Sequence, residues 1–180
     1  VIALIVNLFV GIALGANVVI ANAIGNSNNE TVKKAVHTSV LISLICSTAV
    51  TIIGEFAASM LLCSLNVPND VLPSALLYLR IYLLGMPVIL LYNFESTIFR
   101  SVGDTKTPLI ALMVSGVLNV ILNLIFVIVF HMTVNGVAIA TVISNAISSA
   151  LLFRRLCTTS LPIHIDIKSL HIDSKTLTRI

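Results

Sequence analysis

The chain has 180 residues, of which 58% are hydrophobic and only 9% are charged, and its mean hydropathy is +1.10. Because soluble domains carry about 25% charged residues, this composition excludes an ordinary soluble domain and indicates helices that face lipid. The formal net charge of +3 gives no sign of a nucleic-acid partner. We therefore expect a membrane protein whose main partner is the lipid bilayer.

Neither end of the chain reads as a natural terminus. It starts at Val1 inside an apolar run, with no basic segment or cleavage site of a signal peptide before it, and it stops in a polar segment at Ile180. We expect a piece of a longer protein whose remaining helices are further partners. The cysteines, Cys46, Cys63 and Cys157, fit neither a disulfide framework nor a zinc motif, so we expect reduced thiols.

Five apolar runs follow one another, each able to cross a hydrocarbon core of roughly 30 Å as a helix. They predict an all-α integral membrane protein, with transmembrane helices in residues 1–155 and a cytoplasmic linker at 156–180. The predicted spans are approximately 1–24, 38–65, 74–101, 109–130 and 136–153.

The first predicted span has a stripe of small and polar residues, namely Asn7, Gly11, Gly15 and Asn22. Such a stripe either packs closely against another helix or faces a substrate. The segment 25–37 that follows is polar and basic, and we expect it to be a loop.

The second and third predicted spans contain charged residues and a proline at membrane depth. Glu55 either faces water near the interface or lines a cavity, because a carboxylate in lipid must be paired or hydrated. Arg80 is near enough to the turn at 66–73 to extend to the interface. Pro87 removes a backbone hydrogen bond in mid-span, which predicts a kink.

The fourth and fifth predicted spans carry amide and hydroxyl side chains. Asn119 and Asn123 are four residues apart and therefore lie on one face of their helix. The last span is rich in Ala, Ser and Gly, which is typical of a tightly packed interior helix. We expect Arg154 and Arg155 to end it.

The positions of Lys and Arg predict the orientation. The loops on one side of the five spans are basic, whereas those on the other side, at 66–73 and 131–135, contain no Lys or Arg. By the positive-inside rule the basic side is cytoplasmic, which indicates a multi-pass membrane protein with its C-terminal segment inside. We expect a bacterial-type cytoplasmic membrane. The expected topology anchors are Lys33, Lys34, Arg100, Lys106, Arg154 and Arg155.

No catalytic motif is present. The sequence lacks GxxxxGK[ST], HExxH and GxSxG, so we expect neither an enzyme nor a resident cofactor. The spans contain instead many uncharged polar groups. For a single Asn, bonding between helices is a sufficient explanation, but a hydrated pathway explains the whole set better. The set is Asn7, Asn17, Asn22, Asn93, Asn119, Asn123, Thr141 and Asn145, with Glu95.

Glu95 has two interpretations. An ionisable residue at membrane depth is by default a hypothesis for a functional site. Glu95 also lies five residues before Arg100, near the predicted cytoplasmic end, where an ion pair with Arg100 or Lys106 is the simpler explanation.

Several stretches resemble, in order, the MATE transporters (multidrug and toxic compound extrusion). GANVVIANAIGN is similar to that family's second helix, and YLRIYLLGMP with YNFESTIFRSVGDTKTPL to its fourth helix and the following loop. GVLNVILNLIFV resembles the fifth helix, NGVAIATVISNAIS the sixth, and KSLHIDSKTLTRI the linker before the seventh.

The resemblance implies a transporter of twelve helices in two six-helix lobes, of which this chain would be helices two to six of the N-terminal lobe. It implies multidrug efflux by alternating access, in exchange for Na⁺ or H⁺, with small cationic or amphipathic substrates. Two alternatives remain open. One is a lipid-linked oligosaccharide flippase of the same superfamily; the other is a non-transporting membrane subunit, in which the polar residues pair helix to helix.

The resemblance also implies candidate site residues. In one branch of the family a first-helix Asp works with an Asn and an Asp four residues later on the fifth helix, and the matching positions here are Asn119 and Asn123. An amide at position 123 does not titrate, but it can coordinate Na⁺ or bind a substrate. Thr141 matches a hydroxyl near that cluster, and Asn93 and Glu95 would lie near the cytoplasmic end of the cavity.

Overall fold

The computed structural model describes residues 2–65, 67–68 and 70–165. All regular elements in these residues are helical, which confirms the predicted all-α class. In chain order they are α1 (Ile2–Gly25), α2 (Asn29–Ser64), α3 (Leu72–Leu84), α4 (Met86–Ser101), α5 (Lys106–Leu124), the short π-helix η1 (Ile125–Val129) and α6 (Val134–Thr158).

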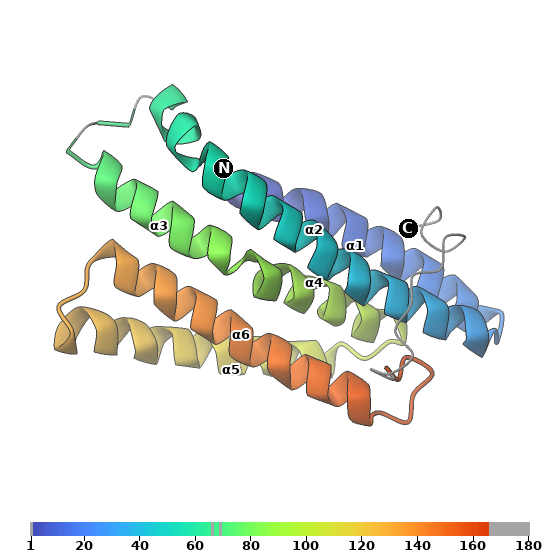
Figure 1. Ribbon diagram of the computed structural model, residues 1–180. Coiled ribbons are helices and arrows are strands. Elements are labelled where there is room, and N and C mark those ends of the chain that lie inside the picture. Colours follow the sequence, from blue (N-terminus) through green and yellow to red (C-terminus); the bar gives the residue numbers. More distant parts are fainter. Residues whose placement is uncertain (1, 66, 69, 166–180) are drawn as a thin grey trace.

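The central element of the bundle is the α3–α4 pair, which lies between α1 and α2 on one side and α5 and α6 on the other (Figure 1). α4 packs against α1, α2 and α6, while α5 packs mainly against α6. The α1–α2 and α4–α5 turns and the end of α6 lie together on the right of Figure 1. We call this the basic end, because it carries the six expected anchors: Lys33, Lys34, Arg100, Lys106, Arg154 and Arg155.

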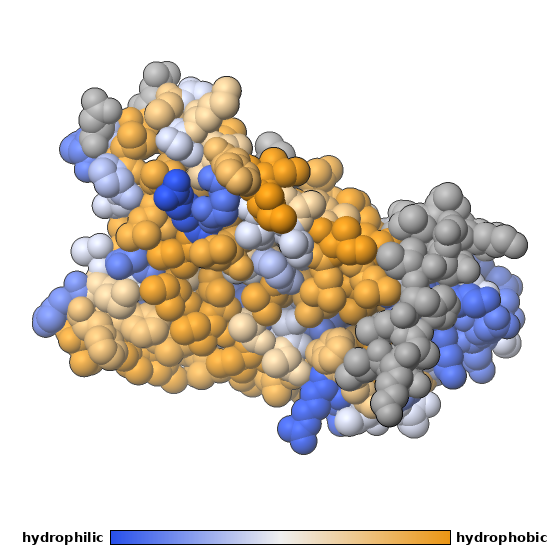
Figure 2. Space-filling model, viewed as in Figure 1, coloured by the Kyte–Doolittle hydropathy of each residue, from blue (hydrophilic) through white to orange (hydrophobic). Residues whose placement is uncertain are grey.

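The outer surface of the bundle is apolar along its length. Phe56 and Met60 on α2 are 85% and 79% exposed, and the outer face of α5 exposes Val117 and Val120. Figure 2 shows hydrophobic colour over most of the middle of the helices, with hydrophilic colour at both ends and in a patch at the upper left. Four helices are long and apolar enough to cross a membrane, and α3 with α4 makes a fifth span if the pair is counted as one. The chain is thus a multi-pass membrane protein.

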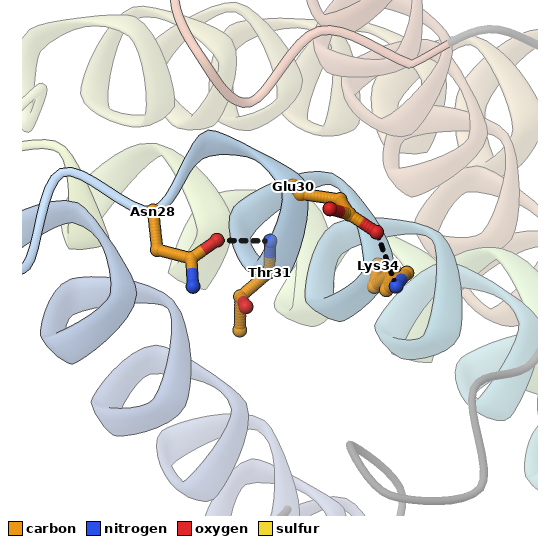
Figure 3. A network of polar contacts seen from close by, with 4 residues as sticks. All are labelled: Asn28, Glu30, Thr31 and Lys34. Atoms are coloured by element: carbon orange, nitrogen blue, oxygen red, sulfur yellow. Dashed lines mark hydrogen bonds and ion pairs between the residues drawn. The ribbon is translucent and has the colours of Figure 1, made fainter.

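α2 begins at Asn29, nine residues before the predicted span, so most of the expected loop at 25–37 is helical. The Asn28 side chain accepts a hydrogen bond from the Thr31 backbone N–H at 3.0 Å and thereby caps the helix. Lys34 forms an ion pair with Glu30 at 2.6 Å, one turn apart on the helix surface (Figure 3). The polar residues therefore extend the helix beyond its apolar part.

α6 continues past Arg154 and Arg155 to Thr158, so the arginines do not end the helix as expected. Both side chains are exposed, and positive charge near a helix C-terminus is favourable. Ile163 and Ile165 then pack into the core of the basic end. Residues 166–180, most of the predicted linker, lie outside the described residues.

The third predicted span is broken where Pro87 predicted a kink, since α3 and α4 meet at an angle of 48°. Pro87 has no N–H to donate to the Leu83 carbonyl four residues earlier. Thr51 of α2 replaces that donor, with its hydroxyl 2.8 Å from the Leu83 oxygen. On the other side Gly85 lies so close to Val142 of α6 that a Cβ atom would overlap it. Neighbouring helices therefore hold the break from both sides.

We expect Thr51→Val to lower the stability of the protein by about 1 kcal/mol, because the Leu83 carbonyl would lose its replacement donor. Thermal unfolding of the purified protein in detergent measures this. Thr48→Val is the matched control, since the Thr48 hydroxyl donates only to Leu44 of its own helix. In a Pro87→Ala background the new N–H bonds to Leu83, so Thr51→Val should cost less there. An equal cost in both backgrounds would contradict the assigned role of Thr51.

Candidate functional site

A cluster of amides and hydroxyls joins α5 to α6. The Asn119 amide nitrogen lies 3.3 Å from both the Thr141 and Ser144 hydroxyl oxygens and donates to them. Asn123 donates to the Asn119 amide oxygen at 3.0 Å. The structure thus brings together three of the expected site residues and adds Ser144. We call Asn119, Asn123, Thr141 and Ser144 the amide cluster.

The amide cluster ends in an unused acceptor. The Asn123 amide oxygen is buried and accepts no hydrogen bond from the described residues. A buried unpaired carbonyl oxygen costs about 1–3 kcal/mol relative to a paired one. It is therefore a ready acceptor for a cation or for a donor group on a ligand.

Asn93 and Glu95 do not join this cluster. Asn93 donates to the Ile89 carbonyl of its own helix at 2.7 Å. Glu95 is completely buried, and its Oε2 atom accepts a hydrogen bond from the Ser149 hydroxyl of α6 at 2.9 Å. Among the described residues it forms no ion pair with Arg100 or Lys106, so that interpretation was wrong. The carboxylate faces α6 inside the bundle rather than the basic turn.

Hydroxyl groups recur along α6 between the amide cluster and Glu95, and those of Ser144 and Ser148 donate to backbone carbonyls of their own helix. We call Thr141, Ser144, Ser148 and Ser149 the hydroxyl seam. Ser144, Ser148 and Ser149 are each at most 2% exposed. Sequence reasoning treated these serines only as small packing residues, although Ser144 and Ser148 follow Thr141 at steps of three and four residues on one side of the helix, with Ser149 next to Ser148.

Glu55 and Arg80 form a second polar contact, between α2 and α3. The Arg80 Nε atom lies 3.6 Å from Glu55 Oε2, and the side chains are 50% and 28% exposed, respectively. Pairing lowers the cost of placing both charges on apolar helices. Their contact joins two helices on the partly exposed face, apart from the buried polar groups of α5 and α6.

The α4–α5 turn is organised by Asp104. Gly103 adopts a φ of 80°, which ends α4 in a conformation that favours glycine. The Asp104 carboxylate then accepts hydrogen bonds from the backbone N–H groups of Lys106 and Thr107 at 3.1 and 3.0 Å. Partial desolvation raises the pKa of Asp104, but bonds from Thr107 and Lys106 and the charge of Arg155 outweigh it, so the pKa lies below its ordinary value of 3.8.

The described residues contain no group of three or more His, Cys, Asp or Glu side chains able to hold a metal ion. The polar groups that converge on the described parts of α5 and α6 are amides and hydroxyls, and the carboxyl group of Glu95 reaches α6 from α4. Such groups bind ligands by hydrogen bonds or weakly coordinate a cation; the Asn119–Thr141–Ser144 bonds also pair helix with helix, as a non-transporting subunit would require.

Fold and site together define a class: a multi-pass helical membrane protein with polar side chains in the interior of its bundle. The comparison with family models is more specific. The model of the MatE family matches residues 1–125, so the chain belongs to the MatE family, as the resemblance in its helices indicated.

Two proteins similar in sequence to this chain are described as probable multidrug resistance proteins. The probable multidrug resistance protein YoeA of Bacillus subtilis is 31% identical over 117 residues, which is 65% of this chain and 25% of YoeA. The probable multidrug resistance protein NorM of Thermotoga maritima is 29% identical over 108 residues, 60% of this chain and 23% of NorM. The chain thus spans about a quarter of the length of these relatives.

Solved structures match almost the whole chain. An inward-facing multidrug resistance MATE family transporter of the MOP superfamily has a TM-score of 0.90 and 26% identity, over 97% of this chain and 40% of that one. A MOP superfamily transporter from Pyrococcus furiosus, described by a binding pocket of reverse polarity, has a TM-score of 0.89 and 25% identity, over 96% of this chain and 38% of that one.

Asn119→Ala should destabilise the α5–α6 pair by about 1–2 kcal/mol, because it removes two interhelical hydrogen bonds and leaves Asn123 without its acceptor. Thermal unfolding in detergent measures this. Asn145→Ala is the matched control, since the Asn145 amide donates to the Thr141 carbonyl of its own helix. Equal destabilisation by both variants would show that the interhelical bonds contribute nothing.

Asp104→Ala should lower stability by about 0.5–1 kcal/mol at neutral pH, because α5 loses its N-terminal acceptor. A lowered folded-state pKa means that this contribution is present above about pH 4 and is lost as the pH falls through the folded pKa. The unfolding curves of wild type and Asp104→Ala should therefore converge in acid. Asp104→Asn keeps an acceptor without a titrating group, so its stability should be near wild type and lack this pH dependence. A constant difference at all pH values would exclude the carboxylate as the cause.

Proposed function

We propose that this chain is part of a multidrug efflux transporter that exports small cationic or amphipathic compounds in exchange for Na⁺ or H⁺. Membership of the MatE family carries the proposal, since relatives with this fold are described as multidrug resistance proteins. The twelve-helix, two-lobe form implied by the resemblance would contain this bundle as helices two to six of the first lobe.

The amide cluster is the proposed substrate and ion site of this lobe. The unpaired Asn123 oxygen would accept a hydrogen bond from a substrate ammonium group or coordinate Na⁺ beside Asn119 and Thr141. Amide and hydroxyl oxygens are hard ligands, of the kind that suit alkali and alkaline-earth cations. Asn93 and Glu95 would lie on the basic-end side of this cavity.

We place the basic end in the cytoplasm of a bacterial-type cell, in the cytoplasmic membrane. The six anchors at this end support that orientation by the positive-inside rule. Alternating access moves helices between two states, and the break at Gly85 between α3 and α4 is the place where this bundle would bend.

Dye transport in everted membrane vesicles that contain the full-length protein tests the proposal. Transport should collapse when an ionophore dissipates the ion gradient, and it should continue without ATP. A requirement for ATP would overturn the mechanism, and a failure to move any cationic dye would favour the non-transporting subunit.

Asn123→Leu should abolish most of this transport at unchanged expression, because leucine has a similar size but no acceptor oxygen. The control Asn145→Ala alters an amide that bonds only within α6 and should transport at nearly the wild-type rate. If Asn123→Leu transports normally, the cavity is not built around the amide cluster.

A further inference from the structure

Glu95 is the acidic side chain that the bundle encloses most completely. Its exposed fraction is 0%, whereas Glu30, Glu55, Asp70 and Asp104, the other acidic residues of the described chain, are all at least partly exposed. Ser149 donates to its Oε2 atom at 2.9 Å, and its Oε1 atom accepts no hydrogen bond from the described residues. One oxygen of a buried carboxyl group is therefore free to carry a proton.

The surroundings offer little to stabilise a negative charge. α1 has no titratable side chain, and the cations of the basic end form no ion pair with Glu95 in the described residues. An ionisable side chain at membrane depth with a single neutral donor is by default a hypothesis for a functional site. The buried or half-buried titratable groups on the helices around it are Lys34, His37, Cys46 and Glu55 of α2, Tyr78 and Tyr82 of α3, Tyr92 of α4 and Cys157 of α6. Arg100 of α4, Lys106 of α5 and Arg154 and Arg155 of α6 are exposed.

A polar hollow approaches Glu95 from the basic end. The hollow has a volume of about 260 Å³, and Phe99 is one of the residues that line it. Phe99 lies four residues after Glu95, so the two side chains are on one face of α4, one turn apart. The Phe99 side chain is 1% exposed, and Glu95 itself does not line the hollow. The other lining residues are Asp104, Thr107, Arg155, Thr158, Thr159, Ser160 and Leu161.

We propose that Glu95 is the proton-exchanging group of this bundle, loaded and unloaded through the polar hollow when Phe99 moves aside. This inference rests on the proposed transport function and selects H⁺ as the coupling ion. In each cycle Glu95 Oε1 binds one proton, and the same O–H bond breaks when that proton leaves; no other bond changes. The hydroxyl seam of α6 runs from Ser149 toward the amide cluster and is the route by which the charge state of Glu95 would affect Asn119 and Asn123.

Infrared spectroscopy of the full-length protein in lipid tests proton binding directly. A protonated carboxyl group has a carbonyl band that disappears on deprotonation. We expect a band that is lost as the pH rises, that is absent from Glu95→Gln and that remains in the control Glu55→Gln. A band unchanged in Glu95→Gln, or one that does not respond to pH, would overturn the proposal.

Ser149→Ala keeps the carboxyl group and tests its surroundings with less risk to folding. The Ser149 hydroxyl donates to the deprotonated form. Its removal should therefore raise the pH at which half of the carbonyl band is lost. Phe99→Ala should speed hydrogen–deuterium exchange of the same band, while Phe99→Leu, which keeps the hollow closed, should not. An unchanged midpoint in Ser149→Ala and unchanged exchange in Phe99→Ala would each contradict the geometry.

Dye-transport assays with different ion gradients distinguish the failure of this inference from the failure of the proposed function. Wild type should move dye on a proton gradient alone, and Glu95→Gln should lose that proton-driven transport. If wild type moves dye on a sodium gradient only, the proposed function holds and the role of Glu95 is wrong. If wild type moves no dye at all, the proposed function fails, while the infrared band still reports whether Glu95 exchanges protons.

Discussion

The constraint on which this bundle depends is that polar groups surrounded by apolar helices must find partners within the protein. The break at Gly85 is possible because the Thr51 hydroxyl donates to the carbonyl that Pro87 leaves unpaired. The Asn119 amide nitrogen donates hydrogen bonds to hydroxyl oxygens of α6 across the α5–α6 contact. Where the requirement is met, the result is helix packing. Among the buried oxygens of the described residues that lack a partner are the Asn123 amide oxygen and Glu95 Oε1, and on these two we base the proposed ligand and proton sites.

The amide cluster and Glu95 therefore both contact α6 but differ in their chemistry. Toward the end opposite the basic end, the amide cluster offers neutral oxygens, which suit a substrate donor or a cation. Nearer the basic end, Glu95 offers a titratable group, and Phe99 on the next helical turn lines the polar hollow. The serines between them are buried and small, so α6 packs closely on α4 while carrying polar atoms along its length. A transporter needs such a connection, because the ion and the substrate must influence each other through the protein.

Much of the fold follows from the sequence because each apolar run is long enough to be a membrane helix, and the charges at its ends predict its direction. The helix ends were less predictable. Hydropathy marks where a helix enters the lipid, but α2 begins earlier at its Asn28 cap, and α6 ends later than Arg154 and Arg155. Caps and exposed charges extend a helix into water without changing its hydropathy, and for that reason the apolar pattern did not show these extensions.

The sequence by itself determined the helical class, the kink at Pro87 and the presence of Asn119 and Asn123 on one face, because these depend on local periodicity and on the chemistry of single residues. It could not determine partners between helices. Only the tertiary structure decided that Glu95 meets Ser149, 54 positions away, rather than Arg100 on its own helix. The position of a side chain along a helix is a local property, but the neighbour it faces depends on how the helices pack against one another.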